Sequence, residues 1–184
     1  MKNDPKISVC MIVKDEEKLL EACLQSINDI VYEIIIVDTG SKDNTIEIAK
    51  KYSANIFSYT WDNSFSNARN YSINKAKGDW LLLLDADEQL VQEDKQKLLD
   101  FIKSTSFDGA HFKMYNYIGE YGSINYTTHN ALRLLKNTGE YYFVGDIHEQ
   151  IARKDGQKMD NKFALLDVRL KHYGYLDNIV KEKR

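Results

Sequence analysis

The sequence predicts an α/β fold in which a mostly parallel central sheet, flanked by helices, is followed by a mixed or antiparallel C-terminal half. Three observations predict it. The 184 residues correspond to about one domain at roughly 150 residues per domain. From Ile7 to Leu84, short apolar runs alternate with helical patterns, which favours right-handed crossovers and parallel strands. After about Ser104 the apolar residues recur with a period of two instead.

Four strands and three helices are expected in the first half. The strands are the apolar, β-branched runs at 7–13, 33–37, 54–58 and 80–84. The first helix has apolar residues at helical spacing from Leu19 to Ile27, and Asp15 is able to cap it. The others cover 45–52 and 65–77, and Gly78 is suited to a left-handed C-cap.

The second half is expected to hold further strands and, at its C-terminus, the beginning of a truncated helix. Apolar residues alternate around Phe112, and strands at 131–135 and 141–144 are separated by a Lys-Asn-Thr-Gly turn. Residues 168–170 are a candidate last strand. The ending has no cap or stop signal, so residues 176–184 are expected to begin a helix that is truncated from a longer protein, after a domain over 1–175.

The composition argues against several classes of protein. A net charge of −3 supplies no basic field for a nucleic-acid backbone. Cys10 and Cys23 lie in apolar patterns without paired metal-ligand spacing, so they are expected to be core residues in a reducing compartment. The apolar run near the N-terminus, residues 7–13, is too short for a secretory signal or a membrane span. These features predict a cytoplasmic, soluble chain.

The strongest chemical signal is Asp85-Ala86-Asp87-Glu88, directly after the apolar strand at 80–84. An apolar strand has no structural use for three carboxylates at its carboxyl end, so they indicate a bound cation. Aspartates at i and i+2 can turn toward one hard divalent ion that keeps waters and binds substrate phosphates. Ligands of open α/β sheets bind at this edge. A solvated turn that caps the next helix is the structural alternative.

Two other predicted strands also end in acidic residues. Asp38 ends the strand at 33–37 and precedes a Gly/Ser/Asp turn, where a carboxylate can accept hydrogen bonds from a nucleoside. Asp15 and Glu16 follow the first strand in the same way. Each segment alone is also explained by an ordinary turn or helix cap. Three acidic strand ends on one sheet together favour a ligand site.

The remaining candidates are an arginine, a glutamate and two histidines. Arg69, next to Asn70, can clamp a diphosphate bidentately, although a surface arginine is the alternative. His148 and His172 lie where strands end, and a neutral imidazole would complete an aspartate-rich Mn²⁺ site. Glu149 can serve as a general base if it faces an acceptor.

These segments together resemble the family 2 glycosyltransferases, which have the GT-A fold. Residues 7–20 resemble the opening strand and its turn, 37–41 the nucleotide-binding turn, and 80–88 the metal strand. Residues 65–70, 145–151 and 172–175 are similar to a bacterial branch. That branch includes lipopolysaccharide-core glucosyltransferases, peptide S-glycosyltransferases and enzymes linked to tetratricopeptide repeats. Asp15 replaces the usual asparagine, and Thr39 stands where many relatives have a second aspartate.

The resemblance implies inverting transfer of a sugar from a nucleotide-diphosphate sugar to a glycan, lipid-linked or peptide acceptor. It implies cell-envelope biosynthesis and peripheral membrane association through the acceptor. Glu149 would be the catalytic base, with Glu88 as second candidate. Mn²⁺ or Mg²⁺ would be held by Asp85, Asp87 or both, with His172 and His148. The implied nucleotide-sugar contacts are Asp15, Glu16, Asp38, Arg69, Asn70, Asp85 and Ala86.

Two other readings remain open. A haloacid-dehalogenase-like phosphatase also places Asp-x-Asp after an apolar strand and would use Asp85 as the nucleophile. Its motif normally opens the sheet, whereas three predicted strands come first here, and Gln89 stands where Thr or Val is usual. A non-catalytic nucleotide-sugar-binding module is the third reading. Phosphate release from a generic phosphoester, with no response to nucleotide sugars, would favour the phosphatase. Stabilisation by a nucleotide sugar without hydrolysis or transfer would favour the binding module.

Overall fold

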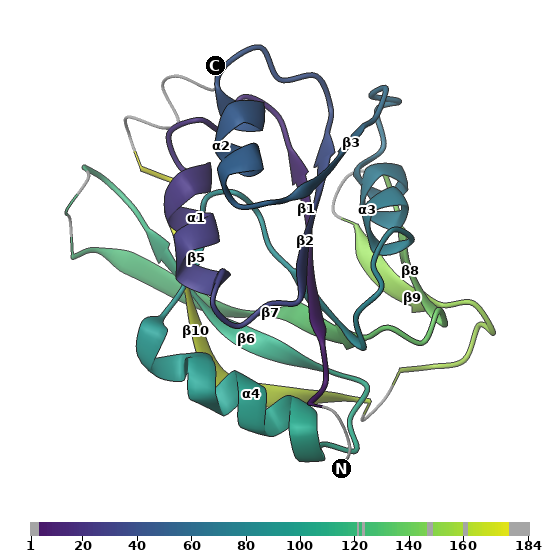
Figure 1. Ribbon diagram of the computed structural model, residues 1–184. Coiled ribbons are helices and arrows are strands. Elements are labelled where there is room, and N and C mark those ends of the chain that lie inside the picture. Colours follow the sequence, from purple (N-terminus) through teal and green to yellow (C-terminus); the bar gives the residue numbers. More distant parts are fainter. Residues whose placement is uncertain (1–3, 121, 123, 147–148, 160–161, 177–184) are drawn as a thin grey trace.

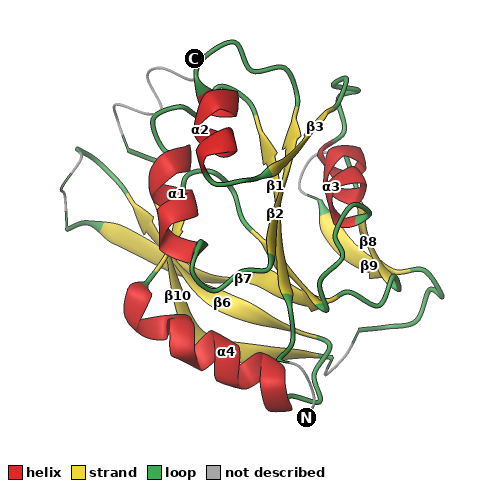
Figure 2. Ribbon diagram, in the orientation of Figure 1, coloured by secondary structure: helices red, strands yellow, loops and turns green. Residues whose placement is uncertain are grey.

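The computed structural model describes residues 4–120, 122, 124–146, 149–159 and 162–176. Figure 1 shows how its helices and strands are arranged, and Figure 2 shows them by type. The helices are α1 Leu20–Ile27, α2 Thr45–Lys51, α3 Phe65–Ile73 and α4 Lys95–Ser104, with the short 3-10 turn η1 Gln92–Asp94 before α4. The strands are β1 Ile7–Val13, β2 Glu33–Asp38, β3 Asn55–Ser58, β4 Trp80–Leu83, β5 Glu88–Leu90, β6 Gly109–Tyr117, β7 Tyr126–Lys136, β8 Tyr141–Val144, β9 Gln150–Arg153 and β10 Phe163–His172.

The described residues form one large sheet with the strand order β3-β2-β1-β4-β7-β6-β10-β5. The first four strands in this order are parallel to one another. β7 then runs antiparallel to β4 and to β6, and β6 pairs in parallel with β10. The prediction of a parallel first half and a mixed second half is therefore confirmed. β8 and β9 form a separate antiparallel hairpin.

Three helices cover one face of the sheet, and α3 with the β8–β9 hairpin covers the other. On one face, apolar residues of α1, α2 and α4 pack with every second residue of β1, such as Val9 and Met11. On the other, Ile73 of α3 and Phe143 of β8 pack with Cys10. Figure 1 shows α1 and α2 on one side of β1 and β2, and α3 with β8 and β9 on the other. Both faces of the parallel strands are therefore buried, which explains their continuous apolar sequences.

The sheet must curl, because the connection from β4 to β5 is short. Five residue steps separate Leu83 from Glu88, and an extended chain covers at most about 18 Å over that length. Along a flat sheet, four strand spacings, or about 19 Å, would separate β4 from β5. The curl brings β5 against α1, where the Leu90 amide donates to Ser26 Oγ at 3.0 Å. Residues 84–87 thus cross the open edge of the sheet instead of following its surface.

Two predictions about helix ends are wrong. α3 ends at Ile73 rather than Lys77, and Gly78 is not its C-cap. A side chain at Gly78 would lie within 3 Å of Ser8 Oγ, because the turn passes directly over β1. Close packing, rather than a left-handed conformation, explains this glycine. Asp15 does not cap α1 either, since its carboxylate accepts a hydrogen bond from the Lys42 amide across the loop.

Several elements were not expected from the sequence, and others are longer than predicted. α4, β5 and β9 were absent from the prediction. β7 extends over 126–136 and β10 over 163–172, beyond the predicted 131–135 and 168–170. Cys10 and Cys23 are buried free thiols, as expected of core residues. No helix within the described residues is long and apolar enough to cross a membrane. The helix expected over 176–184 lies, apart from Leu176, outside the described residues.

Candidate active site

A cleft of about 520 Å³ opens where the parallel strands end. β1, β2 and β4 are adjacent and parallel, so their carboxyl ends meet at one edge of the sheet. Side chains from all three ends, from α3, from the segment before β9 and from the end of β10 enclose the cleft. They include Glu16, Thr39, Arg69, Asp85, Asp87 and Glu149, together with Ala86, His172, Trp61 and Phe65.

The first two strand ends are tied to each other. The Asp15 amide donates to Ser41 Oγ at 3.0 Å, and the Asp15 carboxylate accepts from the Lys42 amide at 2.7 Å. Asp38 accepts from the Ser41 amide at 3.0 Å and so closes its own turn. Asp15 adopts a left-handed conformation with φ of 53°. In this arrangement the carboxylates of Asp15 and Asp38 shape the loops, while Glu16 lines the cleft.

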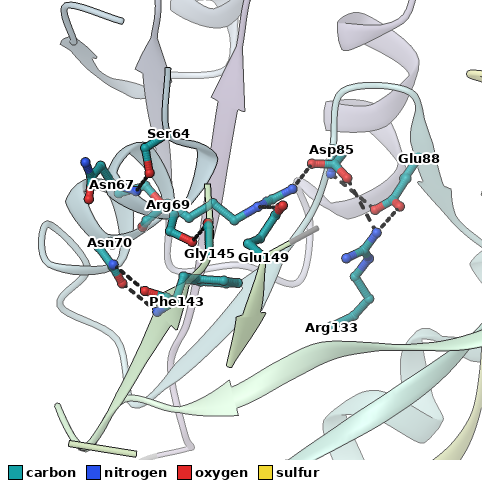
Figure 3. Close-up of polar contacts among 12 residues, drawn as sticks. Ser64, Asn67, Arg69, Asn70, Asp85, Glu88, Arg133, Phe143, Gly145 and Glu149 are labelled. Atoms are coloured by element: carbon teal, nitrogen blue, oxygen red, sulfur yellow. Dashed lines mark hydrogen bonds and ion pairs between the residues drawn. The ribbon is translucent and has the colours of Figure 1, made fainter. Parts of the chain in front are cut away.

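Arg69 lies at the centre of the cleft between two carboxylates. Its Nη2 is 2.9 Å from Asp85 Oδ1, and its Nε is 2.6 Å from Glu149 Oε1. Figure 3 shows its side chain reaching from α3 between these two acids. Only 12% of the Arg69 side chain is exposed, so both contacts lie largely out of water. Arg69 therefore joins the segment after β4, through Asp85, to the segment before β9, through Glu149.

Asp85 and Glu88 share a second arginine, whose side chain is 18% exposed. Arg133 Nη2, from β7, lies 2.5 Å from Glu88 Oε1 and 3.4 Å from Asp85 Oδ2 (Figure 3). Burial alone would raise the pKa of Asp85, but Arg69 and Arg133 hold that pKa well below its usual value. Burial raises the pKa of Glu88 despite its pairing with Arg133. The two arginines therefore favour the ionised form of Asp85. Glu88 is only 1% exposed and contacts Arg133 in the interior, behind the cleft surface.

Asp87 and His172 lie together at the other side of the cleft. His172 Nε2 is 3.4 Å from Asp87 Oδ1, and His172 Nδ1 is 2.8 Å from Asn116 Oδ1. Burial of the imidazole would lower the pKa of His172, but the neighbouring Asp87 raises it overall. A side chain at Gly174 would lie within 3 Å of both Asp87 Oδ2 and His172 Nε2. The backbone at Gly174 thus closes one side of this pair.

The donor set of Asp85, Asp87 and His172 suits Mn²⁺ or Mg²⁺. Within the described ranges, no group of three or more His, Cys, Asp or Glu side chains is arranged to hold a metal ion. Ions of this kind in phosphate-transfer sites use one or two carboxylates, waters and the phosphates of the substrate, so a complete cage is not required. Asp87 and His172 fit a metal shared with a bound diphosphate, and Asp85 lies beside them with its charge directed at two arginines.

Asn70 lines no part of the cleft and instead fastens the hairpin to α3. Its side-chain amide donates to the Phe143 carbonyl at 2.9 Å and accepts from the Phe143 amide at 2.7 Å. The Phe65 amide donates to the Asp146 carbonyl at 3.2 Å, and Ser66 Oγ donates to the Gly145 carbonyl. These contacts place Glu149 opposite Arg69. His148, predicted as a metal ligand, lies outside the described residues.

The structure thus brings Glu16, Arg69, Asp85, Ala86, Asp87, Glu149 and His172 to one cleft. Sequence reasoning did not identify Arg133 or Asn116. A signal existed for Arg133, because it is one charged residue in the otherwise apolar run 131–135. No local signal marked Asn116, which comes into contact with His172 only through the pairing of β6 with β10.

A sequence profile for glycosyl transferase family 2 matches residues 8–162, so the chain belongs to this family of transferase enzymes. The resemblance noted from the sequence is confirmed. The structure also matches that of S. aureus TarS, with a TM-score of 0.68 over 91% of this chain and 36% of that chain, at 19% identity. This likeness confirms the GT-A fold.

Two similar curated proteins are considerably longer than this chain. A TPR repeat-containing protein of Synechococcus elongatus is 37% identical over 92% of the chain and 42% of its own length. The SPbeta prophage-derived glycosyltransferase SunS of Bacillus subtilis is 30% identical over 97% of the chain and 42% of its own length. The chain therefore spans about two fifths of the length of these two relatives. The family match does not favour the phosphatase reading.

Proposed function

We propose that this chain is the catalytic part, over residues 1–175, of a metal-dependent inverting glycosyltransferase that uses a nucleotide-diphosphate sugar. The observation that carries the proposal is the cleft itself. It gathers a metal-type carboxylate and imidazole pair, an arginine and a candidate base at the carboxyl edge of a GT-A sheet. Each group has a role in transferring a sugar away from a diphosphate.

The donor is proposed to bind along the strand ends. Arg69 faces the same cleft as Asp87, which suits contact with the two phosphates. Glu16, Asp85 and Ala86 line the path of the nucleotide sugar. Asp15 and Asp38 hold the loops that would contact the nucleoside of the donor. Asn70 fixes the hairpin that leads to Glu149, near which the sugar of the donor would lie.

Asp87 and His172 are proposed to hold Mn²⁺ or Mg²⁺, with Asp85 nearby and His148 as a candidate from the sequence. A divalent ion at this place supplies positive charge against the leaving diphosphate. Arg69 adds to that charge from the side of α3. Asp85 keeps Arg69 and Arg133 oriented through its ion pairs.

Glu149 is proposed as the general base because it borders two cavities. A second cavity of about 600 Å³ shares Arg69 and Glu149 with the donor cleft, and apolar side chains such as Leu83, Phe143, Ile151 and Met159 line it. We assign the acceptor to this second cavity. Glu149 takes the proton of the acceptor nucleophile, which forms the new bond to the sugar carbon. The bond from that carbon to the diphosphate oxygen breaks, and its electron pair leaves with the diphosphate.

Glu88 is less suited to be the base than Glu149. Both glutamates are paired with an arginine, but Glu88 is buried and borders neither of the two cavities, so an acceptor in either cavity does not meet its carboxylate. The proposed acceptor is a glycan, a lipid-linked sugar or a peptide. The proposal also includes a cytoplasmic location, a peripheral association with the membrane and a role in the cell envelope. TarS has been crystallised in complex with UDP-GlcNAc, which makes that compound a sensible first probe.

The proposal is tested with Glu149→Gln. Thermal unfolding with nucleotide-diphosphate sugars, with and without Mn²⁺, first identifies a donor by its stabilisation of the native state. The variant should keep this stabilisation, but its rate of sugar transfer should fall by about 10²–10⁴-fold, because the glutamine amide cannot take the proton of the acceptor.

Glu140→Gln is the matched control, since Glu140 is exposed and borders neither cavity. Unchanged transfer by Glu149→Gln would assign the base elsewhere. Stabilisation of the wild type without any turnover would support the non-catalytic binding module.

A further inference from the structure

A buried asparagine connects the imidazole of His172 to a second histidine. Asn116 of β6 is 5% exposed. Its Oδ1 lies 2.8 Å from His172 Nδ1, and its Nδ2 lies 2.9 Å from His129 Nδ1. The same Nδ2 is 3.4 Å from the Thr127 carbonyl oxygen. The asparagine therefore contacts β7 on one side and the candidate metal ligand on the other.

The Thr127 carbonyl determines which way the amide points. A carbonyl oxygen only accepts hydrogen bonds, so the amide nitrogen must face Thr127 and His129. Asn116 Oδ1 then faces His172, and this oxygen too can only accept. His172 must therefore donate from Nδ1, which places the proton of its neutral ring there. In this neutral ring the Nε2 lone pair faces Asp87 Oδ1, 3.4 Å away, whereas a protonated ring, which Asp87 favours, would donate to that oxygen.

The second histidine fits the same assignment. His129 Nδ1 receives the amide N–H and so acts as an acceptor. Loss of hydration and the nearby charge of Arg133 lower the pKa of His129, which keeps its ring neutral and able to accept. Both partners of the amide nitrogen are thus acceptors, and neither allows the amide to turn over.

We propose that Asn116 is a positioning residue that fixes His172 in the Nδ1–H tautomer and so directs its Nε2 lone pair to the metal site. Metal-binding histidines commonly donate their other ring N–H to a fixed acceptor, which orients the ring. Here the asparagine carbonyl is that acceptor. The inference rests on the metal-dependent function proposed above. A His172 ring with its proton on Nε2 would present no lone pair to a cation.

The tautomer can be measured without any metal. Two-dimensional ¹⁵N–¹H spectra of histidine rings distinguish the two tautomers, and the chain has only four histidines. Above its titration range, His172 in the wild type should show the Nδ1–H pattern. Asn116→Leu should shift it toward the Nε2–H pattern. An Nε2–H pattern in the wild type would overturn the inference, whatever the protein does with metal.

Binding of Mn²⁺, followed by electron paramagnetic resonance of the free ion, tests the consequence. Asn116→Leu should weaken binding by about 10–100-fold. Asn116→Asp keeps the acceptor of the Nδ1–H but sets its second oxygen against two acceptors, the Thr127 carbonyl and His129 Nδ1. It should therefore bind Mn²⁺ more tightly than Asn116→Leu but less tightly than the wild type. Asn137→Leu is the matched control: it removes an amide that holds the Ala76 and Gly78 carbonyls. That variant should lose stability without losing Mn²⁺ affinity.

The possible outcomes separate this inference from the proposed function. Equal Mn²⁺ affinity in the wild type and Asn116→Leu would overturn the positioning role. If Asn116→Leu does not fold, Asn116→Ala removes the same acceptor of the His172 N–H with a smaller side chain and should weaken Mn²⁺ binding as well. A wild type that binds no Mn²⁺ would contradict metal dependence, while the tautomer spectra would still decide the role of Asn116.

Discussion

Gly174 shows how a single residue without a side chain can determine the spacing of two others. Any Cβ there would lie within 3 Å of Asp87 Oδ2 and His172 Nε2, the two atoms that face the candidate metal position. The backbone also supports Asp87 from this side, because the Tyr173 amide donates to the Asp87 carbonyl at 3.0 Å. A side chain at position 174 would therefore displace Asp87, His172 or both from their present positions.

Gly174→Ala should weaken Mn²⁺ binding by at least about tenfold, because the new methyl group forces Asp87 and His172 to move apart. Calorimetric titration with Mn²⁺ measures the effect. Gly109→Ala is the control: its Cβ would also be too close to a neighbour, the Leu134 carbonyl, but outside the cleft. If both variants bind Mn²⁺ as the wild type does, Gly174 has no part in the site.

At the scale of elements, α4 is held to β10 by a buried carboxylate. Asp94, at the start of α4, is fully buried and accepts from Arg169 Nε at 2.6 Å and from the Arg169 amide at 3.0 Å. Lys97 adds an ion pair at 2.9 Å. Burial alone would raise the pKa of Asp94, but the hydrogen bonds from Arg169 and Lys97 lower it to about 2.

Asp94→Asn should lower the free energy of unfolding by about 2 kcal/mol at pH 7. A carboxylate with a lowered pKa stabilises the fold above its unfolded pKa, near 4, and this stabilisation is lost as the pH falls toward 2. The difference between wild type and variant, measured by urea denaturation, should therefore shrink between pH 4 and pH 2.

Asp167→Asn is the control for this prediction, because Asp167 also pairs with Lys97 but its side chain is 80% exposed. Removing an exposed ion pair should cost less than about 1 kcal/mol at any pH. A difference for Asp94→Asn that is the same at pH 7 and pH 2.5 would show that its ionisation does not stabilise the fold.

Elements with a strong local pattern were predictable, and those defined by distant partners were not. β1, β2 and β4 are continuous apolar runs because both faces are buried, so their positions and shared edge followed from the sequence. β9 has no such pattern, since Gln150–Arg153 gains its structure only by pairing with β8. Arg133 showed the signal of one charge in an apolar run but nothing local that indicated its partner, and Asn116 showed no signal. Their partners Asp85 and His172 lie 48 and 56 residues away in the sequence.

At the scale of the whole molecule, β7 joins the two halves of the sheet. Leu134 pairs with Leu82 of β4 and with Ala110 of β6, and its side chain is fully buried. Glu16 and Asp85 of the cleft follow parallel strands, whereas His172 and Arg133 come from the second half. Both halves must therefore be folded for the cleft to exist.

Leu134→Ala should lower the free energy of unfolding by about 2–5 kcal/mol, because it leaves a cavity between the two halves. Hydrogen exchange should report this loss alike for amides of β2 and of β10. Leu165→Ala is the control, since Leu165 is 70% exposed, and it should change stability by less than about 0.5 kcal/mol. Loss of protection in β10 alone would mean that the halves unfold separately.

The short crossing from β4 to β5 has a thermodynamic consequence. Strands fix residues 84–87 at both ends, and the Leu84 amide also donates to the Cys10 carbonyl at 3.3 Å. A segment this short has little conformational entropy left to lose when a charged ligand arrives. The attraction between the ligand and these carboxylates can therefore contribute to affinity almost in full, whereas a longer, looser loop would first have to become ordered.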